Sequence, residues 1–322
     1  MSSEKAKPSF PNSPVLNERY RPVTISDCIL KESAKNIFQG MVEEGVIKNV
    51  LLSGPSGTGK TTVAKALCAE LDIEYIIINA SSERGIDVLR TTISSFASTA
   101  SMNGRRRCVI LDESDHLADL TQAAFRHVIE QFSDNCSFIF TCNYPDRIID
   151  ALKSRLTLID FSVSEEEMTE MVVGIVERVQ CILNNEGISY NADVVMELVY
   201  YLYPDVRRVL NKIDVYSKQR GVIDVGIMED LQTANINTLI NYLAAKDFKS
   251  VRGWCANAAK TNTTNIYGDL YRLLFTTLEK DDIPQAILIL NDAQRYDHIV
   301  QNKELHLVGL CTTLLLECNF IK

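Results

Sequence analysis

A glycine-rich segment near residue 54 has the residue types and spacing that bind phosphate groups. The sequence GPSGTGKTTVAKAL directly follows the apolar run VLLS. It places Gly54, Gly59, Lys60 and Thr61 in the Walker A pattern, G-x-x-x-x-G-K-[ST], between an expected strand and an expected helix. Because backbone amides at a helix start and the lysine can hold phosphate oxygens, the pattern predicts a nucleoside triphosphate site.

A pair of acidic residues downstream supplies groups that a hydrolytic site needs. The segment RRRCVILDESD is expected to be a buried strand that ends on Asp112 and Glu113, the Walker B arrangement. Asp112 would hold Mg²⁺ together with the Thr61 hydroxyl, because this hard cation prefers oxygen ligands. Glu113 would orient or deprotonate the attacking water. A lone acidic pair often just ends a strand, but its order after the Walker A loop predicts hydrolysis.

Further polar residues along the chain could act on the phosphates. Asn143 ends another apolar run, from which its side chain could reach the γ-phosphate or the water. Arg155 precedes the last expected strand, and Arg207 and Arg208 begin a later helix. An arginine can neutralise charge on a transferring phosphoryl group, also from a neighbouring subunit. Singly, an asparagine is a common turn residue and an arginine a common surface residue, so the joint order carries the interpretation.

Five short apolar runs in the first half predict the strands that position these residues. The runs are continuous rather than alternating, and helical patterns separate most of them, which is typical of a parallel sheet covered on both faces. Ligands bind at the carboxyl ends of such strands. The expected strands span residues 50–53, 75–79, 108–112, 137–141 and 157–161.

Helical patterns dominate the second half, where no strand run recurs. Ser164 followed by Glu167 predicts a capping box, and Gly221 predicts the end of a later helix. We therefore expect an α/β domain, a small helical domain and a separate helical domain. Their expected bounds, after a flexible tail at 1–17, are 18–162, 163–234 and 235–322.

Composition limits the class of protein. With 46% hydrophobic and 23% charged residues, the 322-residue chain is expected to be an ordinary globular protein. A formal net charge of -9 argues against nucleic-acid binding through the overall field, so any such contact needs a local basic stripe. The nine cysteines form no C-x-x-C pair. Without a signal-peptide pattern or a membrane-span pattern, we expect a cytoplasmic protein with neither zinc nor disulfides.

In combination these motifs resemble those of the AAA+ ATPases, and more narrowly the clamp loaders of the replication-factor-C type. The narrowing depends on ERYRP at 18–22, SSERGIDVLR at 81–90, FASTASMNG at 96–104 and TQAAFRHVIE at 121–130. The chain is most similar to the large ATPase subunits of T-even-like bacteriophage clamp loaders. The resemblance implies an α/β AAA+ P-loop domain with a five-stranded parallel sheet, a small helical lid and a C-terminal all-α collar.

The resemblance also implies roles for the nucleotide site, with ATP and Mg²⁺ as cofactors. Asn143 matches sensor 1, Arg207 matches sensor 2, and Arg155 matches an arginine finger that acts on the adjacent subunit's ATP, with Arg126 at the same interface. The catalytic set is Glu113, Lys60, Asn143, Arg155 and Arg207, and the metal ligands are Thr61 and Asp112. The nucleotide-binding set is Tyr20, Arg21, Pro22, Gly54, Gly57, Thr58, Gly59, Lys60, Thr61, Thr62 and Arg207.

Two departures from the family pattern leave these roles in place. The usual SRC is SRL here, with Leu156 after the finger, and DEAD is DESD.

The resemblance also implies contacts with DNA and with the clamp. Arg84 and Arg90 would touch template-strand phosphates, which positions the duplex without reading its sequence. Arg84 could also hold Glu113 away until DNA arrives. Phe96 and Met102 would form a tip that enters a pocket on the sliding clamp, although a methionine of this kind is as often core.

We therefore expect a DNA-stimulated ATPase that opens a sliding clamp and loads it at primer-template junctions during replication. Several identical copies would form an open spiral with a smaller clamp-loader subunit, as a pentamer held by the collar. In a phage, it would work in the host cytoplasm. The alternatives are a nucleotide-bound scaffold that does not hydrolyse, another AAA+ remodeller such as a helicase loader or branch-migration motor, and a small-molecule P-loop kinase.

Overall fold

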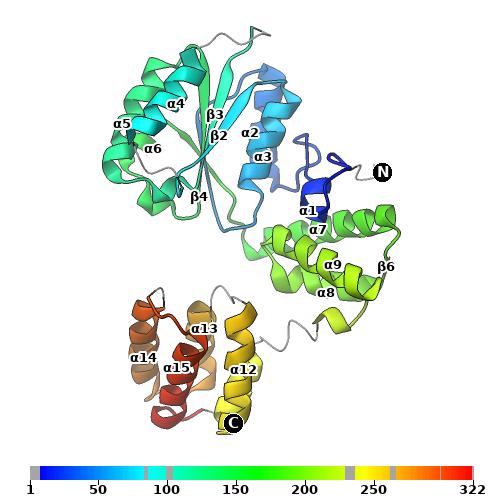
Figure 1. Ribbon diagram of the computed structural model, residues 1–322, viewed down its shortest axis with the longest axis vertical. Helices are drawn as coiled ribbons and strands as arrows, with labels where there is room; N and C mark the ends of the chain where they lie inside the picture. Colours follow the sequence, from blue (N-terminus) through cyan, green and yellow to red (C-terminus); the bar gives the residue numbers. More distant parts are fainter. Residues whose placement is uncertain are drawn as a thin grey trace. The chain divides into compact units, whose positions relative to one another are not determined.

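The computed structural model describes residues 8–82, 86–98, 104–228, 236–261, 266–297 and 299–320. The chain divides into two compact units, Met1–Asp224 and Val225–Lys322 (Figure 1). The expected α/β domain and most of the expected lid belong to the first unit. The division falls ten residues before the collar boundary expected from the sequence at residue 235.

A five-stranded parallel sheet forms the centre of the first unit, in the order β2-β3-β4-β1-β5. Each strand lies within one residue of its predicted bounds, so the predicted sheet is confirmed. Strand β4 lies between β1 and β3, which brings the residues after all three strands to one edge. The strands are β1 Val50–Ser53, β2 Tyr75–Asn79, β3 Arg107–Asp112, β4 Cys136–Cys142 and β5 Thr157–Asp160.

Helices cover both faces of the sheet (Figure 1). Helices α2 (Glu32–Glu44) and α3 (Lys60–Glu70) pack on one face, where Phe38 and Leu67 are fully buried. Helices α4 (Ile86–Ser98), α5 (Asp119–Gln131) and α6 (Asp150–Lys153) pack on the other. Each buried side chain of this size contributes about 1.5 to 3 kcal/mol, which explains why the central strands are mostly apolar.

The segment before the sheet folds onto the rest of the unit. A short helix, α1 (Leu16–Arg19), buries Leu16, and the amides of Ser9 and Phe10 donate to the Arg19 carbonyl at 2.8 and 3.1 Å. The flexible tail predicted for residues 1–17 is therefore wrong for residues 9–17. Its polar and proline-rich composition is typical of a flexible tail, whereas the burial of Leu16 and the backbone hydrogen bonds to Arg19 hold it in place.

Three helices form the lid, α7 (Glu165–Glu186), α8 (Ala192–Leu202) and α9 (Val206–Arg220). The predicted capping box at Ser164 and the left-handed glycine cap at Gly221, with φ of 74°, are both confirmed. Two strands of two residues, β6 (Ser189–Tyr190) and β7 (Val222–Ile223), pair in parallel. The prediction that no strand follows the main sheet is thus wrong, because two residues are too few to produce a recognisable pattern.

Helices make up the second unit in the part of it that the structure describes, apart from one isolated antiparallel bridge between Leu278 and Phe320. Their apolar faces share one core that includes Trp254, Leu270 and Leu314. The helices are α11 (Ile236–Ala244), α12 (Phe248–Thr261), α13 (Ile266–Thr277), α14 (Ile283–Tyr296) and α15 (Lys303–Glu317).

Helix α15 contains the most apolar late stretch of the sequence and is partly buried in this core, as predicted. Across the described residues, no helix is both long and apolar enough to cross a membrane. All nine cysteines are free thiols, and eight of them are buried. Burial in apolar surroundings raises the pKa of the Cys28 and Cys136 thiols to about 12, so these side chains act as small hydrophobic residues.

Candidate nucleotide-binding site

The phosphate-binding loop connects β1 to α3. Gly59 precedes the helix with φ of 91°, a left-handed conformation that glycine adopts without a steric penalty. The Thr58 hydroxyl closes the turn by donating to the Pro55 carbonyl at 2.9 Å. Helix α3 therefore begins at Lys60, and its first amides, which have no partner within the helix, face the loop.

Lys60 is held inside the loop by three oxygen atoms. Its Nζ donates to the Gly54 carbonyl at 2.7 Å, the Pro55 carbonyl at 2.8 Å and Asn143 Oδ1 at 3.0 Å. The residue is only 8% exposed, and this burial lowers its pKa, with a smaller contribution from the charge of Arg207. An ammonium group has three donors, so phosphate oxygens can replace these acceptors one for one.

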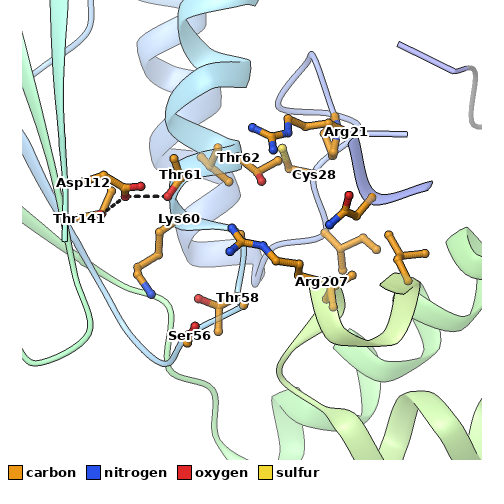
Figure 2. A pocket seen from close by; sticks show the side chains of 18 of the residues that line it. Arg21, Cys28, Ser56, Thr58, Lys60, Thr61, Thr62, Asp112, Thr141 and Arg207 are labelled. Atoms are coloured by element: carbon orange, nitrogen blue, oxygen red, sulfur yellow. Dashed lines mark hydrogen bonds between the residues drawn. The ribbon is translucent and has the colours of Figure 1, made fainter. Parts of the chain in front are cut away.

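The hydroxyls of two threonines converge on the Asp112 carboxylate. Thr61 Oγ1 donates to Asp112 Oδ1 at 2.7 Å, and Thr141 Oγ1 donates to the same oxygen at 2.5 Å (Figure 2). Hydroxyl and carboxylate oxygens this close suit Mg²⁺, which takes oxygen ligands and usually keeps several waters. Thr61 and Asp112 therefore fit the predicted metal site. Thr141 was not predicted, because it contacts Asp112 only through the pairing of β4 with β3.

The residue after Asp112 has an unusual backbone conformation. Glu113 adopts φ of 57° and ψ of 43°, and its amide donates to Thr141 Oγ1 at 3.1 Å. Left-handed residues other than glycine are uncommon and gather at functional sites. Directly after the neighbouring strand β4, the amides of Asn143 and Tyr144 donate to Asp115 Oδ2 at 3.3 and 3.2 Å. The turn after β3 thus fixes the turn that carries Asn143.

These elements enclose a cavity of about 190 Å³. Its walls bring together most of the predicted nucleotide-binding residues. They come from the leader (residues 8–31, before α2), the phosphate-binding loop, the strand ends and the lid. Arg207 extends from α9 toward the loop, near Thr58 (Figure 2). Gly54 contributes its carbonyl to Lys60 and lines a separate hollow. The predicted residues on the cavity wall are Tyr20, Arg21, Pro22, Gly57, Thr58, Gly59, Lys60, Thr61, Thr62, Asp112, Glu113, Asn143 and Arg207.

Two residues of lid helix α7 hold the leader against the lid, and neither was predicted from the sequence. Arg178 donates to the carbonyls of Tyr20 and Asp27, both at 2.9 Å. Glu186 accepts from Tyr20 Oη at 2.7 Å and also pairs with Arg19. Burial, together with the hydrogen bond to Glu186, raises the pKa of Tyr20 to about 12, so the phenol stays protonated and remains a donor.

Arg155 lies away from this cavity. It precedes Thr157, which begins β5 and pairs with Val50 at the start of β1, whereas the phosphate-binding loop follows the end of β1. Arg155 Nε donates to Glu130 Oε1 at 3.0 Å, and Arg126 Nε is 3.7 Å from the same oxygen. The hydrogen bond from Arg155 lowers the pKa of Glu130. The structure thus brings both predicted interface arginines together, at the opposite edge of the sheet from their own loop.

Several predicted contact residues are not described. Arg84 and Met102 lie outside the described residues, and of Arg90 only its place on α4 is described. Phe96 is half-buried against the core, with the Arg107 guanidinium 4.8 Å from its ring centroid. Its role at the clamp stays a prediction.

Three consecutive arginines, two before β3 and Arg107 as its first residue, contact neighbouring elements. Arg107 pairs with Glu74 at 2.8 Å, and Arg105 donates to the Leu71 carbonyl. Arg106 approaches the Cys136 carbonyl at 3.5 Å. Two backbone carbonyls and one carboxylate thus accept from these guanidinium groups, and all three partners lie far away in the sequence.

Comparison with known proteins agrees with this site. The family described as "ATPase family associated with various cellular activities (AAA)" matches residues 50–163. The family described as "Sliding-clamp-loader large subunit, AAA+ ATPase lid domain" matches residues 167–229. Among solved structures, the RuvB Holliday junction branch migration motor of Thermotoga maritima is similar in fold. Its TM-score is 0.56 at 14% identity, with 90% of each chain covered.

Similarity over almost the whole chain is found with phage proteins. The sliding-clamp-loader large subunit of Enterobacteria phage T4 is 34% identical over 310 residues, 94% of this chain and 96% of that protein. The same subunit of Escherichia phage RB69 is 32% identical over the same shares. A replication factor C small subunit of Archaeoglobus fulgidus is 36% identical over 67% of this chain and 66% of its own length. The predicted resemblance is confirmed, and the chain belongs to the sliding-clamp-loader large subunits, a family of AAA+ ATPases.

Proposed function

We propose that this protein is the ATPase subunit that opens a sliding clamp and loads it at primer-template junctions during DNA replication. One observation carries the ATPase part, namely the convergence of Lys60, Asn143 and Asp112 on one cavity that Arg207 of the lid also lines. Whole-length similarity to clamp-loader large subunits supports the clamp-loading part. Because these relatives are phage proteins, we expect it to act in the cytoplasm of an infected host.

In the proposed reaction, the chain's own groups bind and orient ATP. Lys60 and the amides at the start of α3 hold the β- and γ-phosphates, and Thr61 and Asp112 would hold Mg²⁺, which would neutralise phosphate charge. Glu113 accepts a proton from, or orients, the attacking water, and Asn143 fixes the γ-phosphate or that water. Arg207 contacts the γ-phosphate, so the position of the lid depends on whether ATP is bound.

A neighbouring copy would complete the site. Arg155 lies at the opposite edge of the sheet from its own loop, so it can neutralise a phosphate only on another subunit's ATP. Arg126 shares Glu130 with it and would face the same neighbour. We propose several copies in a pentamer with a small clamp-loader subunit, assembled through the C-terminal helical unit. Arg84 and Arg90 would hold primer-template DNA, and Phe96 and Met102 the clamp.

The test is steady-state ATP hydrolysis by the chain with its small partner, with and without primed DNA and sliding clamp. Wild type is compared with Arg155→Ala, and with Arg220→Ala, an exposed lid arginine, as the matched control. We expect DNA and clamp to stimulate wild type and the control. In Arg155→Ala, hydrolysis falls by about 10³-fold or more, while ATP binding is retained.

Three outcomes would contradict the proposal. If DNA and clamp do not change the rate of hydrolysis, the chain is still an ATPase, but the result points to another AAA+ remodeller. Absence of hydrolysis in wild type, with ATP still bound, would point to a nucleotide-bound scaffold. If Arg155→Ala keeps full stimulated activity, the arginine is not a finger for the neighbouring subunit.

A further inference from the structure

Arg178 occupies an unusual place for a charged side chain. It projects from α7 of the lid, lines the nucleotide cavity and is half-buried. That burial lowers its pKa, even though the Asp27 carboxylate nearby acts in the opposite direction. Partial removal of a guanidinium from water is unfavourable unless its donors find acceptors in the protein, so this position favours specific partners.

The partners of Arg178 are two backbone carbonyls of the leader. Nη2 donates to the Tyr20 carbonyl and Nη1 to the Asp27 carbonyl, both at 2.9 Å. These carbonyls lie seven residues apart in the chain, and Tyr20, Asp27 and Cys28 all contribute to the cavity wall. The planar fork of arginine reaches two acceptors from two separate nitrogens in a fixed geometry, whereas a lysine would have to reach both from one nitrogen. Arg178 therefore closes the 20–27 segment into a loop against the lid.

The same lid also reaches the phosphate end of the cavity. Arg207 begins α9, and Asp205, which caps this helix, lies against Gly57 of the phosphate-binding loop. Helices α7 and α9 each pack against α8, so the two arginines belong to one packed group of helices. One end of the cavity is held by Arg178 through the leader, and the other end faces Arg207.

Because the phosphate-binding loop forms one end of the cavity, the base of a bound nucleoside triphosphate would lie at the leader end, and we propose that Arg178 is a positioning residue for this base. It acts through the leader, whose shape it fixes, and it makes the base-binding end of the cavity part of the lid. The base and the γ-phosphate would then both act on the position of the same packed lid helices. This inference rests on nucleotide binding in the cavity and is independent of clamp loading.

The test separates the base end of the site from the phosphate end. For wild type, Arg178→Ala, Arg178→Lys and the control Arg220→Ala, dissociation constants are measured for Mg-ATP and for Mg-tripolyphosphate, by displacement of a fluorescent ATP analogue. Km and kcat for ATP hydrolysis are measured in parallel. Tripolyphosphate has no base, so it probes the phosphate-binding loop alone.

We expect Arg178→Ala to raise the Kd and Km for ATP by about tenfold or more, which corresponds to a loss of about 1.4 kcal/mol of binding free energy. Tripolyphosphate affinity and kcat should match wild type. Arg178→Lys keeps the charge but would have to reach both carbonyls from a single nitrogen, so its ATP affinity should lie between those of wild type and Arg178→Ala. The control should match wild type throughout.

Other outcomes would overturn the proposal. Equal losses for ATP and tripolyphosphate would mean that Arg178 merely supports the fold of the unit. Unchanged ATP affinity would mean that the leader keeps its shape without Arg178. If Arg178→Ala does not fold, Arg178→Lys decides alone, because wild-type ATP affinity in that variant would exclude a need for the bridging fork.

Discussion

Among single residues, Glu186 shows how the leader depends on charge. Its carboxylate accepts from Tyr20 Oη and pairs with Arg19. Burial alone would raise the pKa of Glu186, but the hydrogen bonds from Arg19 and Tyr20 outweigh it, and the pKa is lowered. A carboxyl group with a lowered pKa in the folded state adds stability above its unfolded pKa of about 4.3. That stability is lost as the pH falls through the folded value.

The corresponding prediction concerns Glu186→Gln. At pH 7 the variant should unfold with a free energy about 1 kcal/mol below that of wild type, a modest value because solvent partly screens the pair. The difference should shrink as the pH falls below about 4.3, where the wild-type carboxylate becomes protonated. Urea unfolding from pH 7 to pH 3 measures it, with the exposed Glu177→Gln as the control. A difference that stays constant with pH would show that the charge of Glu186 is not its source.

The single residues that sequence motifs predict are those whose chemistry lies in a local pattern. Lys60, Asp112 and Asn143 follow consecutive signals along the chain and meet at one edge because their strands are parallel. Thr141 and Arg178 carry no such signal. Each acts through a partner far away in sequence, so only the folded chain reveals it.

At the scale of elements, the contact between the loop and the lid depends on one missing side chain. Gly57 has φ of 79°, and a Cβ built there would lie 2.7 Å from the Asp205 Cα and would overlap its carboxylate. The carboxylate could rotate away, but the backbone at the start of α9 could not. The loop can therefore approach the lid this closely only with glycine at position 57.

We accordingly expect Gly57→Ala to lower ATP affinity by about tenfold or more, because α9 must move and carries Arg207 with it. Gly45→Ala is the matched control, since Gly45 has φ of 70° but no heavy atom within 4 Å of its Cβ position. The control should lose only about 1 to 2 kcal/mol of unfolding free energy from left-handed strain and keep its ATP affinity. Isothermal titration with Mg-ATP and urea unfolding measure both. Equal ATP affinities in the two variants would contradict the close approach.

Elements differ in how much of them the sequence predicts. The main strands are continuous apolar runs, because both faces of the sheet are covered, and this makes them recognisable. The β6 and β7 pair and the ordered leader depend on a few backbone hydrogen bonds to distant residues. Such bonds leave no periodic pattern, so these elements were missed.

Across the whole molecule, the two compact units have separate hydrophobic cores. In the first unit the residues on both faces of the sheet are buried without help from the C-terminal helices. In the second, α11 to α15 share a core that contains Trp254 and Leu314. A unit with its own core can fold alone, and the proposed roles divide in the same way, with ATP binding in the first unit and assembly in the second.

The last prediction separates these two roles. A chain cut after residue 229 keeps the entire matched lid and should fold, bind ATP with wild-type affinity and remain a monomer. Because no neighbour then supplies Arg155, its hydrolysis with primed DNA, clamp and partner should be lower by about 10³-fold or more. Analytical ultracentrifugation measures assembly, and Arg155→Ala in the full-length chain supplies the comparison, being assembled but inactive. If the shortened chain still assembles with its partner, the assembly surface lies in the first unit, and the role proposed for the C-terminal helices is wrong.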